Sequence, residues 1–177
     1  DIVCLQESTP AWQGWLTPRL TDLYPPSLFR HSRGAGGQAV FSKAAVTESA
    51  WIPAPSGWFP GWILRAETPI GPLQILALHL HPAVTDEGHF SVAAYFSTGD
   101  VRLDEIRTYH ARLDQGLPTV VVGDLNEGDS GGAVAWLVAR GYTDALPEFE
   151  GAGDTWEWPW GPFTIAKRLD HILYSRD

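Results

Sequence analysis

The sequence lacks methionine, has a single cysteine, and contains no long apolar run. Because Cys4 is alone, no intrachain disulfide forms, and the fold must depend on its hydrophobic core. No apolar stretch approaches the roughly 20 residues that a membrane-spanning helix needs, so no transmembrane segment is predicted. The missing methionine means that the sequence does not start at an initiator, and we expect that the natural N-terminus has been removed.

Basic residues are also scarce. Lys and Arg number 12 against 21 Asp and Glu, which gives a net charge of -9. A protein that binds duplex DNA tightly and without sequence preference usually carries a basic footprint, because neutralising phosphates drives that binding. The composition therefore predicts no strong duplex-DNA footprint, although a local basic patch or a bound divalent cation would compensate.

The remaining composition is that of an ordinary globular chain. Hydrophobic residues make up 44% and charged residues 19% of the 177 residues, which is enough for one domain with a sizeable core. No linker or internal repeat divides the chain, so residues 1–177 are predicted to form a single domain.

Apolar runs and helical spacing alternate along the chain. The pattern predicts strands at 2–5, 38–42, 46–51, 62–67, 73–80, 119–122 and 169–174, and helices at 11–24, 100–113 and 131–140. It also predicts an irregular loop over 81–99 and a Trp-rich loop containing Trp156, Trp158 and Trp160.

Polar side chains recur where the apolar strands end. Glu7 follows the first strand, His79 ends another, Asp124 and Asn126 follow a third, and Asp170 lies in the last. Active sites are commonly assembled at strand ends, because the sheet fixes their spacing. Each residue alone has a structural explanation: Gly-Asp-x-Asn favours an Asx turn, and a lone His is usually a satisfied structural residue.

Five segments together resemble the endonuclease/exonuclease/phosphatase superfamily, the DNase I-like phosphoesterases. They are DIVCLQE (1–7), GGQAVFSK (36–43), LQILALHLHP (73–82), LPTVVVGDLNE (117–127) and KRLDHILYS (167–175). The resemblance covers nearly the whole chain, in the family's order. It implies an α+β fold: a four-layer α/β/β/α sandwich of two packed mixed β-sheets, incomplete at both termini.

The resemblance also implies a function, divalent-metal-dependent hydrolysis of a phosphodiester or phosphomonoester by in-line attack of water. Glu7 resembles the carboxylate that binds Mg²⁺ or Mn²⁺, which prefer oxygen ligands. Asp124 resembles the residue that orients or deprotonates the water, and Asn126 the one that helps to hold the phosphate. His79 falls where a phosphate-contacting His or Tyr is found, and Asp170 resembles the carboxylate that orients a catalytic His.

The sequence departs from the family pattern at both ends. The family has an Asn ligand on a strand before DIVCLQE and a Ser-Asp-His segment after RLDHI, and this sequence contains neither. His171 is no substitute for the missing His, because adjacent strand residues point to opposite faces. We therefore expect the 177-residue chain by itself to be nearly inactive.

Two alternatives remain open at this stage. One is a zinc-dependent hydrolase built on His79 and His81 with Asp124 and His171. The other is a non-catalytic binding module that retains the scaffold.

The substrate class also remains open among nucleic acid, a phospholipid head group and a small phosphate ester. The three tryptophans Trp156, Trp158 and Trp160 are compatible with core packing, with stacking on bases, and with a lipid interface.

Overall fold

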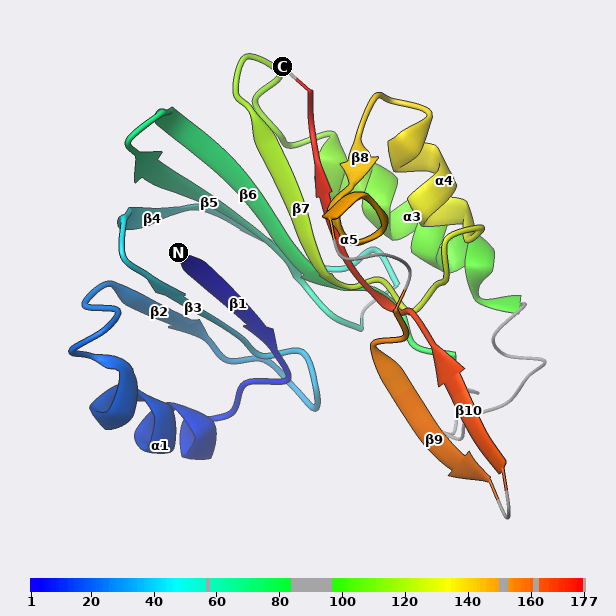
Figure 1. The fold of residues 1–177 in the computed structure, drawn as a ribbon, viewed down its shortest axis with the longest axis horizontal. Coiled ribbons are helices and arrows are strands. Elements are labelled where there is room, and N and C mark those ends of the chain that lie inside the picture. The colour runs from blue at the N-terminus through cyan, green and yellow to red at the C-terminus, as the bar shows by residue number, and fades with distance from the viewer. Residues whose placement is uncertain (57, 84–96, 150–152, 161–162, 177) are drawn as a thin grey trace.

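The structure is a computed structural model that describes residues 1–56, 58–83, 97–149, 153–160 and 163–176. Its largest element is a six-stranded sheet in the order β4-β5-β6-β7-β11-β8 (Figure 1). These strands are β4 (Ala45–Ile52), β5 (Gly61–Thr68), β6 (Gly71–His79), β7 (Thr119–Asp124), β11 (Asp170–Tyr174) and β8 (Thr143–Asp144). Only β6 and β7 pair in parallel; the other neighbours are antiparallel.

A second, three-stranded sheet has the order β1-β3-β2, with β1 (Ile2–Gln6), β3 (Gln38–Ser42) and β2 (Ser27–Arg30). All its pairs are antiparallel, so the expectation of two mixed sheets is wrong for this one. Helix α1 (Pro10–Leu20) follows β1, and the hydroxyl of Thr9 caps it by accepting from the N–H of Trp12 at 3.2 Å.

Helices α3 (Gly99–His110) and α4 (Gly132–Val138) cover one face of the six-stranded sheet (Figure 1). Their apolar side chains form one core with the inward side chains of β5, β6, β7 and β11. The central members are Ile106, Tyr109, Leu137, Leu76, Leu78 and Val121. The predicted helices at 100–113 and 131–140 are thus confirmed, because a stripe of apolar residues at helical spacing needs such a face to cover it.

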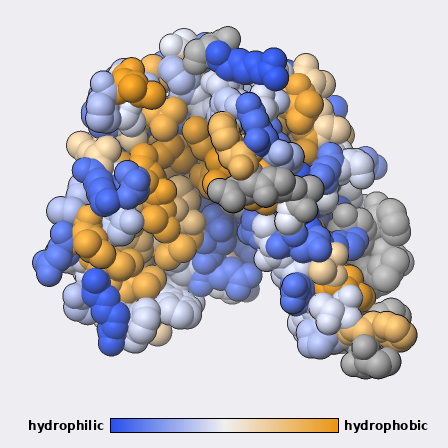
Figure 2. Space-filling model, in the orientation of Figure 1, coloured by the Kyte–Doolittle hydropathy of each residue, from blue (hydrophilic) through white to orange (hydrophobic). Residues whose placement is uncertain are grey.

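The opposite face of the six-stranded sheet meets the three-stranded sheet. Val40 of β3 packs with Trp62 and Leu64 of β5 and with Ile75 of β6, while Cys4 of β1 lies at the margin of the cluster. Beside this contact, β1 and the faces of β6, β7 and β11 line an apolar hollow of about 390 Å³, and Figure 2 shows apolar side chains gathered around it. The two sheets therefore touch along part of their facing surfaces.

The predicted Trp-rich loop is wrong. Residues Trp156–Trp160 form strand β9, which pairs with β10 (Phe163–Lys167) in an antiparallel hairpin that projects from the body of the fold (Figure 1). The alternation of Trp with other residues in Trp-Glu-Trp-Pro-Trp is the period of a strand, and Pro159 is tolerated because the hairpin has only edge strands.

A short helix, α5 (Ala145–Phe149), follows β8. Most of the predicted irregular loop over 81–99 lies outside the described residues. Within the described part of the chain, no helix is both long and apolar enough to cross a membrane.

Candidate active site

Three of the predicted site residues lie side by side in neighbouring strands. Asp124, the last residue of β7, is in register with His79 at the end of β6 and with Asp170 at the start of β11. Directly opposed residues of paired strands place their side chains on the same face of the sheet. The sheet therefore brings together residues that are up to 91 positions apart in the sequence.

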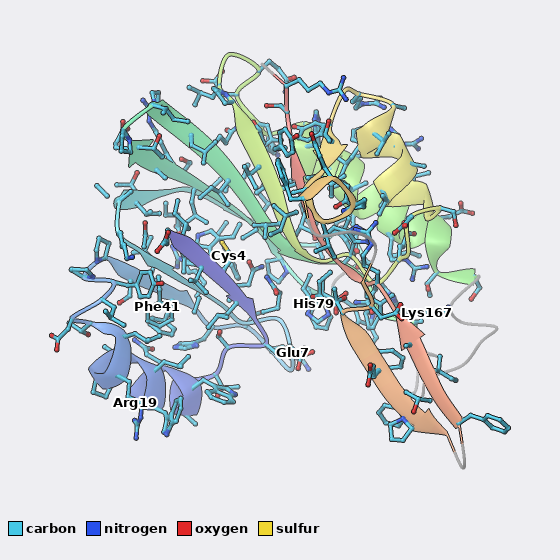
Figure 3. The ribbon with its side chains drawn as sticks, in the orientation of Figure 1. Cys4, Glu7, Arg19, Phe41, His79 and Lys167 are labelled. Carbon is cyan, nitrogen blue, oxygen red and sulfur yellow. The ribbon has the colours of Figure 1, made fainter. Side chains whose placement is uncertain are left out.

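Glu7 reaches the same end of the fold from the other sheet. It follows β1 directly and is exposed, and Figure 3 draws it at the same end of the fold as His79. Its backbone has a φ of 56°, in the left-handed region. The next residue, Ser8, donates its N–H to the carbonyl of Gly37 at 2.9 Å. A side chain at Gly37 would overlap the backbone of Ser8. The absence of a side chain at Gly37 therefore lets the chain beside Glu7 approach the start of β3.

Asp124 and Asn126 form a tight turn. The carboxylate oxygen Oδ1 of Asp124 accepts the N–H of Asn126 at 2.7 Å, and the side-chain amide of Asn126 donates to the carbonyl of Leu80 at 2.9 Å. The Asx-turn explanation is thus correct, and it does not compete with a functional one, because one amide N–H of Asn126 and one oxygen of Asp124 are not used by these two bonds. Among the described non-glycine residues, only Glu7 and Asn126 have positive φ. Strained backbone of this kind is concentrated at functional sites.

Burial raises the pKa of Asp124 from 3.8 to about 7. The N–H of Asn126 and the charge of Arg102 oppose this rise, whereas the charges of Asp170 and Glu7 add to it. A carboxylate whose pKa lies near neutrality is well suited to accept a proton from water at physiological pH.

His79 is neutral in the free protein. Burial lowers its pKa to about 4, although its bond to the carbonyl of Ala35 and the charge of Asp170 oppose that effect. Its ring is stacked on Phe59, with ring centroids 4.2 Å apart. Nε2 of His79 lies 3.6 Å from Oδ2 of Asp124, which is longer than a hydrogen bond. Burial disfavours the charged form of both groups, which argues against an ion pair between them.

The donor set fits a hard divalent cation. Asp124 and Asp170 lie opposite each other in register, and the charges of Asp170 and Glu7 add to the rise that burial causes in the pKa of Asp124, so a cation placed beside Asp124 would relieve that repulsion. Mg²⁺ needs only one or two carboxylates and keeps several waters. In the described part of the chain, no group of three or more His, Cys, Asp or Glu side chains is arranged so that it could hold a metal ion.

The histidines of the zinc alternative do not converge. His171 is buried, with Nδ1 2.7 Å from the carboxylate of Asp144 and Nε2 2.8 Å from the carbonyl of Glu127. His81 contacts the carbonyl of Pro82 through Nδ1 at 2.8 Å. Both nitrogens of His171 are therefore engaged in holding the fold, as expected for a residue that points away from Asp170.

Sequence reasoning missed a buried ionic pair behind the site. Arg102 of α3 donates through Nε to Oε1 of Glu127 at 2.9 Å, and each residue is 2% exposed. The predicted helix over 100–113 gave no indication that Arg102 is buried. The signal available in the sequence was Glu127 itself, a carboxylate next to Asn126.

The aromatic hairpin adjoins the site. The hydroxyl of Thr155, which immediately precedes β9, accepts the backbone N–H groups of Leu169 and Asp170 at 3.1 and 3.0 Å. The rings of Trp156 and Trp158 lie 6.0 Å apart and nearly parallel, at 9°. The base of the hairpin is therefore fixed to the start of β11, beside Asp170.

Solved structures with the same fold come from several organisms. The chain superposes on TDP2 from Caenorhabditis elegans with a TM-score of 0.66 at 21% identity, over 99% of this chain and 54% of that one. An endonuclease/exonuclease/phosphatase from Beutenbergia cavernae superposes with a TM-score of 0.70 at 19% identity, over 99% of this chain and 55% of that one. The human Nocturnin catalytic domain with bound sulfate superposes with a TM-score of 0.63 at 18% identity, over 99% of this chain and 69% of that one.

The chain thus spans about half the length of the first two of these structures. At such identities the likeness shows the fold, which is DNase I-like. A comparison with curated protein sequences found no match. A family model, described as the Endonuclease/Exonuclease/phosphatase family, matches residues 1–177. The resemblance of the five segments is confirmed: the chain belongs to the Endonuclease/Exonuclease/phosphatase family.

Proposed function

We propose that this protein is a divalent-metal-dependent phosphoesterase that hydrolyses a phosphodiester or phosphomonoester by in-line attack of water. The observation that supports the proposal is the strand register that sets Asp124 beside His79 and Asp170, together with the rise in the pKa of Asp124 to about 7. Membership of the family and the DNase I-like fold support it. The sulfate bound in the Nocturnin structure is a tetrahedral anion on a related fold, which is compatible with a phosphate-ester substrate.

Each residue has a role that follows from its surroundings. Glu7, exposed at the end of β1, would hold Mg²⁺ or Mn²⁺, which when bound neutralises phosphate charge. Asp124 orients the attacking water and takes its proton, because its pKa lies near neutrality. Asn126 donates its unused amide N–H to a phosphate oxygen, which an amide does without repelling the anion.

His79 and Asp170 act as a pair in this proposal. The charge of Asp170 raises the pKa of His79 against the effect of burial. A bound phosphate would act in the same direction, so a larger fraction of His79 carries a proton that it can donate when substrate is present. We further propose that the two sheets, with α1 outside one and α3 and α4 outside the other, are the layers of a four-layer sandwich.

The test is an activity panel on the full-length protein. Bis(p-nitrophenyl) phosphate is assayed with EDTA, Mg²⁺, Mn²⁺ or Zn²⁺, followed by single-stranded DNA, phospholipid and sugar-phosphate substrates under the best condition. The expected result is turnover with Mg²⁺ or Mn²⁺ and none with EDTA. Asp124→Asn should lose about 10²–10⁴ in rate, the usual contribution of positioned proton transfer.

The matched control is Asp114→Asn. Asp114 is an exposed carboxylate near the opposite end of β7, where its Oδ1 accepts the N–H of Gly116. This variant should keep the wild-type rate. Turnover that depends on Zn²⁺ alone would support the zinc hydrolase instead, and no turnover under any condition would leave a binding module as the better description.

A further inference from the structure

Glu127 is held by three bonds from three different elements. Its Oε1 accepts Nε of Arg102 at 2.9 Å, and its Oε2 accepts the N–H of Ala133 in the first turn of α4 at 2.7 Å. Its own carbonyl lies 2.8 Å from Nε2 of His171 in β11. The side chain is almost completely buried, at 2% exposure, so the bonds from Arg102 and Ala133 replace water around a buried carboxylate.

The space around this carboxylate is shaped to fit it. A side chain at Gly131 would overlap both the carboxylate and the Cβ of Glu127. The absence of a Cβ at Gly131 therefore lets the carboxylate reach the start of α4. The segment from Glu127 to Ala133 is therefore shaped around the buried side chain of Glu127 and differs in this from an ordinary surface turn.

Arg102 extends the same network to the other wall of the site. Its Nη1 donates to the carbonyl of His81 at 3.3 Å and to the hydroxyl of Thr98 at 2.6 Å. The neighbouring Leu80 donates its N–H to the carbonyl of Asp124 at 2.9 Å and accepts the amide of Asn126 at 2.9 Å. The chain after β6 and the turn after β7 are therefore tied to each other and to α3.

We propose that Glu127, through its buried pair with Arg102 and its bond to the N–H of Ala133, is a positioning residue that holds the turn carrying Asp124 and Asn126 in its catalytic geometry. The turn needs such support, because Asn126 has a left-handed backbone with a φ of 51°, which costs free energy unless the surroundings fix it. Glu127 touches no reacting atom in this proposal and acts through Asp124 and Asn126.

The inference rests on the proposed function for its kinetic consequence, but its structural consequence is measurable without activity. Hydrogen exchange is measured on the metal-free protein for the backbone N–H of Asn126, for the N–H groups of α4, and for Leu76 in the core. Glu127→Ala should speed exchange at Asn126 and in α4 while leaving Leu76 protected, because local opening differs from global unfolding. Glu127→Gln should be intermediate, since its amide oxygen still accepts from Ala133 but its charge no longer pairs with Arg102.

The kinetic arm measures kcat and KM per folded molecule. A displaced catalytic group costs about 10²-fold for a shift of about 1 Å, so Glu127→Ala should lower kcat by about that factor with KM changed less than about threefold. The matched control is Glu67→Ala, which breaks an exposed Glu–Arg pair with Arg65 and should change neither exchange at Asn126 nor kcat.

Three outcomes overturn the inference. If only the N–H groups of α4 exchange faster, Glu127 is a helix cap and nothing more. If Leu76 loses protection as much as Asn126 in both Glu127 variants, the role is global stability. If exchange at Asn126 accelerates but kcat per folded molecule is unchanged, the turn does not position catalytic groups. A wild-type protein without phosphoesterase activity would refute the proposed function, while the exchange data would still decide whether Glu127 holds the turn.

Discussion

Replacing Asp124 by Asn should make the metal-free protein more stable at alkaline pH. Burial raises the folded-state pKa of Asp124 to about 7 from 3.8. Between these values the folded protein keeps a proton that the unfolded chain releases, so stability falls as pH rises through this window. Asparagine carries no charge at any pH, and its oxygen still accepts the N–H of Asn126.

The size of the effect follows from the pKa difference. A rise of about three pH units corresponds to about 4 kcal/mol at pH values above 7. The Asp124 side chain is 24% exposed, so water reduces this figure, and about 2–4 kcal/mol is a reasonable range. For a chain of this length, that difference corresponds to roughly 5–15 °C in Tm. Below about pH 4 the Asp124 side chain is neutral, like the asparagine that replaces it, and the pH-dependent difference in stability between the two proteins should vanish.

The assay is urea unfolding and thermal melting of both proteins from pH 4 to pH 8.5, in EDTA. Titrating groups that do not interact with Asp124 contribute equally to the two proteins, so the difference between them reports Asp124 together with its coupled neighbours Asp170 and Glu7. A difference that does not change with pH, or an Asn variant that is less stable throughout, would refute the burial and the charge arrangement described for the site. Adding Mg²⁺ should reduce the difference in stability between the variant and the wild type, because a nearby cation favours the ionised carboxylate of Asp124.

Three further perturbations have definite expectations. Glu7→Gln should raise the Mg²⁺ concentration needed for half-maximal activity, since it removes the exposed carboxylate proposed to bind the metal; an unchanged titration curve would exclude that role. His79→Tyr should keep part of the activity by donating a hydrogen bond and His79→Ala should not, so equal rates would indicate no direct contact with phosphate. Gly123→Ala should lower the free energy of unfolding by about 2 kcal/mol or more, because φ is +142° there and a Cβ would overlap the carbonyl of Leu78; denaturant unfolding measures this, and a neutral effect would contradict the close β6–β7 contact.

The sequence by itself determined the family, the main strands and the identity of the candidate site residues. Residue patterns of this kind are local: an apolar run ended by Gly-Asp-x-Asn specifies a buried strand and a turn whatever surrounds them. The observed turn, in which Asp124 accepts the N–H of Asn126, follows directly from these residue types. The alternation of Trp with other residues in β9 is equally local and indicates a strand, whereas the proline and the cluster of tryptophans favour a loop.

Only the tertiary structure decided how the site residues meet and what state they adopt. The register that aligns His79, Asp124 and Asp170 joins strands far apart in sequence, and no local pattern encodes a pairing partner. The same holds for protonation: the residue type alone does not set the pKa of His79, which burial lowers to about 4 in the folded protein. The pair formed by Arg102 and Glu127 was invisible for the same reason, because two charged residues 25 positions apart look like solvated surface until the fold buries them together.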